Sequence, residues 1–84
     1  MIYKVILAKE AVKSLDRVDR GLESRLRESL RKLENEPEKQ GKTLKSMKDL
    51  CSLRVGAWRI LYTINIDSSI VYVLAIKARS QAYK

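Results

Sequence analysis

The sequence predicts an α+β fold, β-α-α-β-β-β, with a helical hairpin packed on one face of a mainly antiparallel sheet. Two patterns predict this class. Apolar residues recur at helical spacing in the first half of the chain and at every second position after residue 50. The length of 84 residues predicts a single domain over residues 1–84, because two independent hydrophobic cores would not fit.

The first half of the chain is expected to form one strand and two helices. Residues 2–8 are rich in β-branched and aromatic side chains and are too few for a helix, so they predict a strand. The apolar residues 12, 15 and 18 then follow a helical step, which the segment 19–21 interrupts. A second, longer helix is indicated by leucines spaced four, four and three residues apart: Leu22, Leu26, Leu30 and Leu33.

The middle of the chain carries the weakest pattern. Pro37 is expected to end the second helix, because a proline disfavours helical backbone at the residue before it. Residues 38–42 predict a polar loop, and the stretch from residue 43 to residue 49 fits neither a helix nor a strand clearly.

Three strands are expected in the second half, over residues 50–55, 58–66 and 70–77. Gly56-Ala57 suits a two-residue hairpin turn, which sets Arg54 opposite Arg59. A three-residue loop 67–69 would pair Ile66 with Ile70 and Arg59 with Lys77. The same register places Tyr62, Tyr72 and Leu74 on the core face of the sheet.

This register gathers cations on the opposite face of the sheet. Arg54, Arg59 and Lys77 would lie in a row across three strands, with Arg79 just beyond the row and no acidic residue in these strands to neutralise it. Directly opposed like charges are unfavourable in a sheet, and arginine presents a planar fork of donors that matches phosphate oxygens. The row therefore predicts an anion site, with a solvated polar face as the alternative.

The overall charge agrees with an anionic partner. The chain has 18 Lys and Arg against 10 Asp and Glu, a formal net charge of +8. The excess lies in residues 37–84, which hold nine basic and three acidic residues. Such an excess suggests nucleic acid, although a merely soluble basic surface would give the same numbers. Lys45 and Lys48, in a run that begins at Lys42, are either phosphate-backbone contacts or a solvated face.

Composition excludes several classes of site. With no histidine and one cysteine, zinc sites and Ser-His or Cys-His triads are excluded, and no metal or cofactor is expected. Cys51 cannot form an internal disulfide, which predicts a reducing, cytoplasmic location, and its apolar register position predicts an inert core thiol. No apolar run approaches the ~20 residues of a membrane span, and early charges at Lys4 and Lys9 argue against a signal peptide, so no membrane partner is expected.

Two stretches, together with the predicted element order, resemble the RelE/ParE toxin superfamily of toxin–antitoxin systems. The first, residues 53–62, reads Leu-Arg-Val-Gly-Ala-Trp-Arg-Ile-Leu-Tyr, and the family commonly shows hydrophobic-Arg-x-Gly-x-aromatic-Arg-hydrophobic-x-Tyr. The second is the ending, residues 77–84, Lys-Ala-Arg-Ser-Gln-Ala-Tyr-Lys, which looks most like archaeal members of the RelE branch. The resemblance runs the length of the chain and implies a RelE-like fold.

The resemblance also implies a ribosome-dependent endoribonuclease. RelE toxins enter the ribosomal A site and cut mRNA there, and a cognate RelB-like antitoxin protein neutralises them. Arg59 and Arg79 correspond to arginines that hold the scissile phosphate, and Tyr83 corresponds to a C-terminal tyrosine that orients or stacks on the substrate. Arg54 belongs to the same basic patch. Attack by the neighbouring 2′-hydroxyl needs alignment and charge neutralisation but no metal.

The chain also departs from the family pattern. Family members place two lysines where this sequence has Leu50 and Ser52, and many have a histidine where it has Ala78. The usual general base and acid are therefore missing, and Lys45, Lys48 or Lys77 would have to substitute for the lysine pair. Two other functions stay open: a ParE-like inhibitor of DNA gyrase without RNase activity, and a degenerate RNA-binding member.

Overall fold

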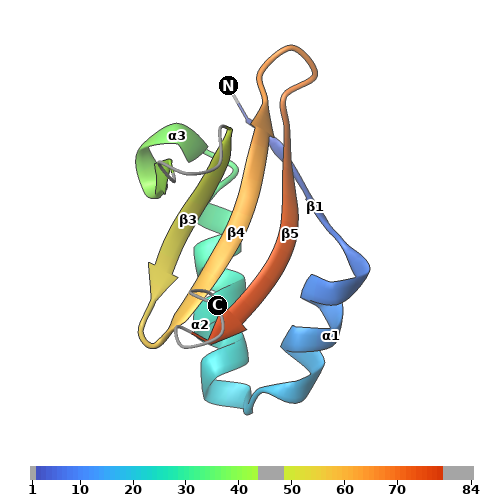
Figure 1. Cartoon of the computed structure of the whole chain (residues 1–84), viewed down its shortest axis with the longest axis vertical. Coiled ribbons are helices and arrows are strands. Elements are labelled where there is room, and N and C mark those ends of the chain that lie inside the picture. Colours follow the sequence, from blue (N-terminus) through green and yellow to red (C-terminus); the bar gives the residue numbers. More distant parts are fainter. Residues whose placement is uncertain (1, 44–48, 79–84) are drawn as a thin grey trace.

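The computed structural model describes residues 2–43 and 49–78, and it has the predicted α+β architecture (Figure 1). A five-stranded sheet has the strand order β1-β5-β4-β3-β2; β1 runs parallel to β5, and the other neighbours are antiparallel. The elements in chain order are β1 (Lys4–Leu7), α1 (Lys9–Arg17), α2 (Arg20–Lys32), α3 (Pro37–Gln40), β2 (Lys42–Thr43), β3 (Leu50–Val55), β4 (Trp58–Asn65) and β5 (Ile70–Ala78).

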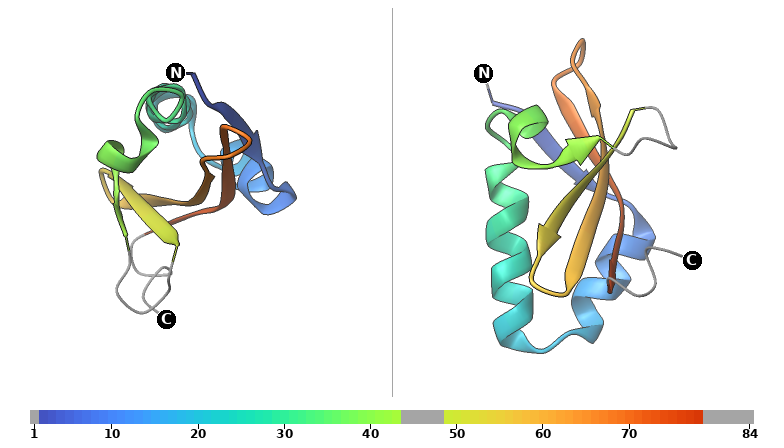
Figure 2. Two further views of the ribbon diagram at one scale, coloured as in Figure 1. Left: turned by 90° about the horizontal axis from the view of Figure 1, so that it is seen from above. Right: turned by 60° about the vertical axis from the view of Figure 1, so that its left-hand side comes forward.

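The two long helices share one hydrophobic core with the sheet. Asp19 caps α2, since its carboxylate accepts a hydrogen bond from the backbone N–H of Leu22 at 2.8 Å. Of the predicted leucine stripe, Leu26 and Leu30 on α2 and Leu33 just after it are buried, and Leu22 is partly buried. The views of Figure 2 show α2 running along the sheet. The buried cluster joins helix residues to strand residues: Ala11, Leu15, Leu26, Leu30, Leu33, Ile60, Tyr62, Val71, Val73 and Ile76.

The segment between α2 and β3 differs from the predicted polar loop. The second helix ends at Lys32, and Pro37 begins the short helix α3 instead of ending α2. Proline suits a first helical position because its missing N–H would have no partner there. Lys42 then pairs with Ser52, and Thr43 pairs with Cys51, so a further strand joins the end of the predicted loop to the start of the stretch that the sequence left unassigned. A strand of two residues is too short to show the alternation of apolar and polar residues by which strands are predicted.

The β3–β4 hairpin has the predicted register. Val55 pairs with Trp58 and Arg54 pairs with Arg59 around a turn in which Gly56 has a φ of 60°. This left-handed backbone suits glycine, which lacks a Cβ. Cys51 is buried beside Tyr62, as the pairing predicts.

The predicted register at the β4–β5 turn is wrong by one residue. Asn65, not Ile66, pairs with Ile70, because Asn65 Oδ1 accepts the Ser68 N–H at 3.1 Å and closes the loop earlier. Tyr72 and Leu74 therefore lie on the outer face, with exposed fractions of 40% and 38%. The buried residues of this strand segment are Val71 and Val73.

A β-bulge restores the predicted pairing further along the hairpin. The register shifts between Leu61 and Tyr62, after which Ile60 pairs with Ile76 and Arg59 pairs with Lys77. The extra residue on β5 compensates the early closure of the loop. None of the described helices has the length and apolar character needed to cross a membrane.

Candidate functional site

Three cationic side chains lie in one row across the sheet. Arg54 on β3 pairs with Arg59 on β4, which pairs in turn with Lys77 on β5. Neighbouring strands are roughly 4.8 Å apart, so the row spans about 10 Å. Arg54 is exposed, whereas Arg59 and Lys77 are partly buried. The sheet therefore brings together three of the residues that the sequence proposed as an anion site.

Ser52 holds the central arginine of this row. Arg59 Nη1 donates a hydrogen bond to Ser52 Oγ at 3.4 Å, and Ser52 is only 8% exposed. Sequence reasoning treated Ser52 as a departure from a family pattern and missed this contact. The signal was present, because residues 52, 54, 59 and 61 share one face of the predicted hairpin.

A groove of about 540 Å³ opens beside Arg59. Its walls come from β2, β3 and β4 and from the residues that lead into β2: Gln40, Gly41, Lys42, Thr43, Ser52, Leu53, Arg54 and Arg59. Lys42 lines this groove because β2 pairs with β3, a pairing that the sequence did not predict. Among the described residues, the lining of this groove contains three cationic side chains and no acidic one.

Tyr62 fixes the segment that forms one wall of this groove. Its hydroxyl donates a hydrogen bond to the Pro37 carbonyl oxygen at 2.8 Å, although 25 residues separate them in sequence. Burial raises the pKa of Tyr62 to about 12, and a hydrogen bond from the Gly41 backbone works against this rise. The phenol therefore stays protonated at neutral pH and acts as a structural donor.

Gly41 is required in this wall by close approach. A Cβ at this position would lie 2.7 Å from both the Ser52 carbonyl oxygen and the Tyr62 hydroxyl oxygen. Its backbone is extended, with φ of −125°, so conformational freedom is not the reason for glycine here. Any larger residue would push the start of β2 away from β3.

Lys77 opens into a different groove from Arg59. This second groove, of about 650 Å³, lies between α1 and β5. Its lining includes two further cations and one acid from α1, and the full set is Glu10, Lys13, Ser14, Arg17, Ala75, Ile76 and Lys77. The cationic row thus ends at helix α1 on the β5 side.

Four other proposed site residues lie outside the described residues: Lys45, Lys48, Arg79 and Tyr83. Their roles remain expectations from the sequence. Within residues 2–43 and 49–78, the structure holds no group of three or more His, Cys, Asp or Glu side chains that could bind a metal ion.

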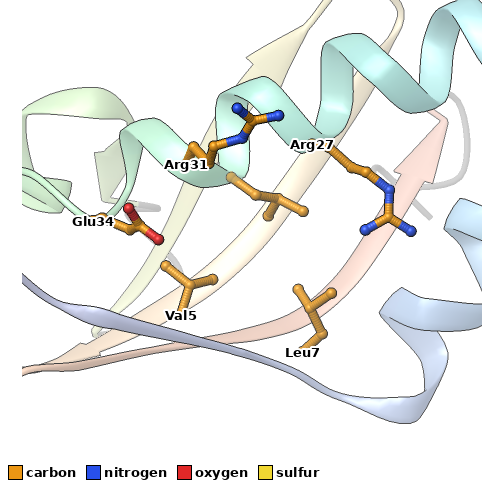
Figure 3. A pocket seen from close by; sticks show the side chains of 6 residues that line it. Val5, Leu7, Arg27, Arg31 and Glu34 are labelled. Atoms are coloured by element: carbon orange, nitrogen blue, oxygen red, sulfur yellow. The ribbon is translucent and has the colours of Figure 1, made fainter.

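A groove of about 310 Å³ lies on another part of the molecule, between β1 and α2 (Figure 3). Its apolar lining consists of Val5, Leu7 and Leu30. Arg27, Arg31 and Glu34 carry the charged groups around it, with their side chains extending from the α2 side in the close-up. An apolar floor with a mainly cationic rim is suited to an amphipathic segment of acidic character.

The comparison with protein families identifies the family of this chain. A family model described as the ParE toxin of the type II toxin–antitoxin system parDE matches residues 5–83. The chain belongs to this toxin family. It is therefore a type II toxin of the RelE/ParE superfamily, as the motifs of residues 53–62 and 77–84 predicted. A comparison with curated proteins gave no match.

Solved structures place this toxin beside RelE proteins. The toxin–antitoxin complex RelBE2 from Mycobacterium tuberculosis matches with 26% identity and a TM-score of 0.84, over 94% of this chain and 100% of that one. The archaeal RelE–RelB complex from Pyrococcus horikoshii matches with 28% identity and a TM-score of 0.81, over 96% and 99%. The isolated Escherichia coli RelE toxin, at 21% identity, shares the fold with a TM-score of 0.75, over 96% and 90%.

Proposed function

We propose that this toxin is a ribosome-dependent endoribonuclease of the cytoplasm that cuts mRNA in the A site. The observation that carries the proposal is the row of Arg54, Arg59 and Lys77 on one sheet face. Arg59 donates a hydrogen bond to Ser52 at the edge of a groove whose described lining residues include cations and no acid. This arrangement suits the phosphodiester backbone of a single RNA strand, with one phosphate at Arg59.

The reaction is an in-line displacement within the RNA itself. The 2′-oxygen forms a bond to phosphorus while the bond from phosphorus to the 5′-oxygen breaks. The 2′-hydroxyl loses its proton, the leaving 5′-oxygen gains one, and the products carry a 2′,3′-cyclic phosphate and a 5′-hydroxyl. The negative charge on the phosphorane oxygens is where Arg59, and by resemblance Arg79, would act.

Few side chains in the proposed site could act as the general base or general acid of the cleavage reaction. Tyr62 is excluded as the base, because it is buried, has a pKa of about 12 and donates to Pro37. Leu50 and Ser52 stand in the family's lysine positions, and neither side chain is a base at neutral pH. We assign orientation of the substrate to Tyr83 and phosphate contacts to Lys77, Lys45 and Lys48. The ribosome would supply the remaining alignment.

The partner that would silence the toxin is a RelB-like antitoxin. Several matching structures are RelB–RelE complexes. The groove between β1 and α2 has an apolar floor and a rim of two arginines and one glutamate, which suits an acidic amphipathic antitoxin segment. The other proposed partners are the mRNA and the ribosome at its A site.

Primer extension on translated mRNA tests the proposed activity. After induction of the toxin, we expect cuts in frame with A-site codons, and we expect none with Arg59→Ala at equal expression. The same RNA incubated without ribosomes should stay intact. Uncut mRNA in growth-arrested cells would overturn the nuclease proposal.

A gyrase inhibitor is the second candidate, and the observation in its favour is that the matching family model is a ParE toxin. A supercoiling assay with purified gyrase separates the two functions. Inhibited supercoiling with intact mRNA would assign the toxin to the ParE activity, and mRNA cleavage with normal supercoiling would assign it to the RelE activity. A protein that does neither but binds RNA would be the degenerate member.

A further inference from the structure

An arginine from α2 packs against the β3–β4 turn. The Arg25 guanidinium lies so close to Gly56 that a Cβ built on this glycine would be 3.3 Å from Arg25 Nη2. Gly56 has a φ of 60°, so its backbone also favours glycine. The turn that sets Arg54 opposite Arg59 therefore lies directly beside a third guanidinium from a different element.

Arg25 lines a further groove, which is separate from the one beside Arg59. The groove measures about 280 Å³ and combines one face of α2 with the end of β3: Arg25, Glu28, Ser29, Lys32, Arg54, Val55 and Gly56. The α2 residues are spaced three, four and seven positions from Arg25, which places them on one side of the helix. Three cations face one acid in this lining.

Arg54 connects this groove to the groove beside Arg59, since it lines both of them. Among the described residues, β2 pairs only with Cys51 and Ser52, so the part of β3 that carries Arg54 lies beyond this pairing. An anionic chain that leaves Arg59 and passes Arg54 therefore reaches Arg25 without crossing another of the described strands.

We propose that Arg25 and Lys32 form a second phosphate subsite, which binds a backbone phosphate of the RNA strand whose scissile phosphate lies at Arg59. The inference rests on the proposed nuclease function. A nucleic acid fits better than a peptide, because the apolar lining is limited to Val55, which is 8% exposed and already part of the core. Phosphate contacts of this kind position a strand without reading its sequence.

Two measurable effects follow for single-stranded RNA. Each phosphate contact to a single strand contributes roughly 0.7 to the slope of log affinity against log salt concentration. Loss of Arg25 should reduce that slope by about 0.7. It should also weaken binding by the same factor for RNAs of different sequence, because a phosphate contact does not read the bases. An RNA with a single phosphodiester cannot reach both subsites, so its binding should not depend on Arg25.

The experiment uses fluorescence anisotropy with 2′-O-methyl RNA probes, which cannot be cleaved, at a series of salt concentrations. The variants are Arg25→Ala, Arg25→Lys, Arg59→Ala and the matched control Arg20→Ala. The control removes the same charge as Arg25→Ala from the first residue of α2, outside both grooves. With an eight-nucleotide probe, we expect a slope reduced by about 0.7 for Arg25→Ala, a parental slope for Arg25→Lys, and a parental slope for Arg20→Ala. With a dinucleotide, all variants should bind equally.

The outcomes separate this inference from the proposed function. Equal slopes for Arg25→Ala and Arg20→Ala, with binding still weakened by Arg59→Ala, would overturn the second subsite alone. If Arg59→Ala binds the RNA probes as tightly as the parent does, the phosphate site on which the subsite rests is wrong. If Arg25→Ala leaves RNA binding unchanged but releases the co-expressed antitoxin, the groove is a protein surface and the proposal is wrong. Thermal melts of each variant establish that the fold is retained.

Discussion

Arg59 combines partial burial with a defined hydrogen-bond partner within the cationic row. Its Nη1 donates a hydrogen bond to Ser52 Oγ at 3.4 Å, and the side chain is partly buried. A long side chain that is already ordered loses less conformational entropy when it binds a phosphate. At the residue scale, Ser52 is therefore a positioning partner of the proposed phosphate ligand.

We expect Arg59→Ala to abolish mRNA cleavage while the protein keeps its fold. The hydrogen bond from this side chain to Ser52 is long, so its loss should cost about 1 kcal/mol or less of stability. Cleavage in a translating extract and a thermal melt measure the two effects together. Normal cutting by a folded variant would show that another group holds the phosphate.

Arg59→Lys provides the matched comparison. It keeps the charge but replaces a planar fork with a point charge, so we expect cleavage between that of the parent and that of Arg59→Ala. A lysine variant as inactive as the alanine variant would mean that fork geometry, and not charge, decides the rate.

Tyr62 makes the wall of the groove sensitive to alkaline pH. Its folded-state pKa of about 12 lies above the ordinary value of 10, so the folded protein binds this proton more tightly than the unfolded chain does. The resulting stability is fully present below pH 10 and is lost as the pH rises from 10 to 12. Tyr62→Phe removes the titration and the hydrogen bond to Pro37, which should cost about 1 kcal/mol at neutral pH.

Urea unfolding of both proteins at several pH values checks this prediction. The parent should lose stability more steeply than Tyr62→Phe between pH 10 and pH 12. Parallel curves would mean that the hydroxyl already titrates in the folded state as it does in water.

At the scale of elements, the β4–β5 hairpin shows where sequence patterns stop being sufficient. The two-residue turn at Gly56 was predictable, because a Gly-Ala pair between alternating strands has few alternatives. The second turn depends on a side-chain contact from Asn65, and the bulge depends on how two strands fit a curved sheet. Neither feature produces a periodic pattern in the sequence. The bulge nevertheless offsets the register shift of the turn, so Arg59 has its predicted partner Lys77.

The corrected register predicts opposite tolerance at neighbouring positions of β5. Val73 is fully buried, whereas Leu74 is 38% exposed. Val73→Asp should prevent folding or cost several kcal/mol, because it places a charge in the core. Leu74→Asp should change stability little. Thermal melts of the two variants decide between this register and the one that the alternation of the sequence favours, which predicts the reverse order.

The α2 helix carries two charged surfaces with different proposed partners. Arg27 and Arg31 border the apolar groove at β1, whereas Arg25 and Lys32 border the groove at the β3–β4 turn. We expect the double variant Arg27→Glu and Arg31→Glu to weaken the antitoxin complex by at least tenfold without affecting mRNA cleavage. Co-purification of the antitoxin and primer extension measure the two properties. Loss of cleavage with retained antitoxin binding would reverse the assignment.

At the scale of the whole molecule, the sheet brings together cationic residues that lie apart in the sequence. The pairing of Arg54 with Arg59 was predictable, because it follows from one turn and the alternation of strands. Lys77 reaches its predicted partner Arg59 only because the bulge cancels the register shift at the second turn. The grooves beside this row were not predictable, because they need β2, α3 and the packing of α2 against the turn. Long-range contacts such as that of Tyr62 with Pro37 have no local signature.

The last residues of the chain give a test that involves the whole molecule. The described core is already formed by residues up to Ile76, so deletion of residues 81–84 should leave the melting temperature within a few degrees of the parent value. It should remove most cleavage, because it removes Tyr83. A truncated protein that melts like the parent and still cuts mRNA would exclude this tyrosine from the mechanism.

The position of β5 in the sheet has a consequence for biosynthesis. This strand lies between β1 and β4, so it joins the beginning of the chain to the hairpin, although it is the last of the described strands to be made. A nascent chain that has emerged only as far as Asp67 has no partner for β1 and lacks Val71, Val73 and Ile76 of the core. Pairing of such distant segments is slow and comes late in folding. The cationic row is completed only when Lys77 pairs with Arg59, so we expect the nascent toxin to be harmless to the ribosome that synthesises it.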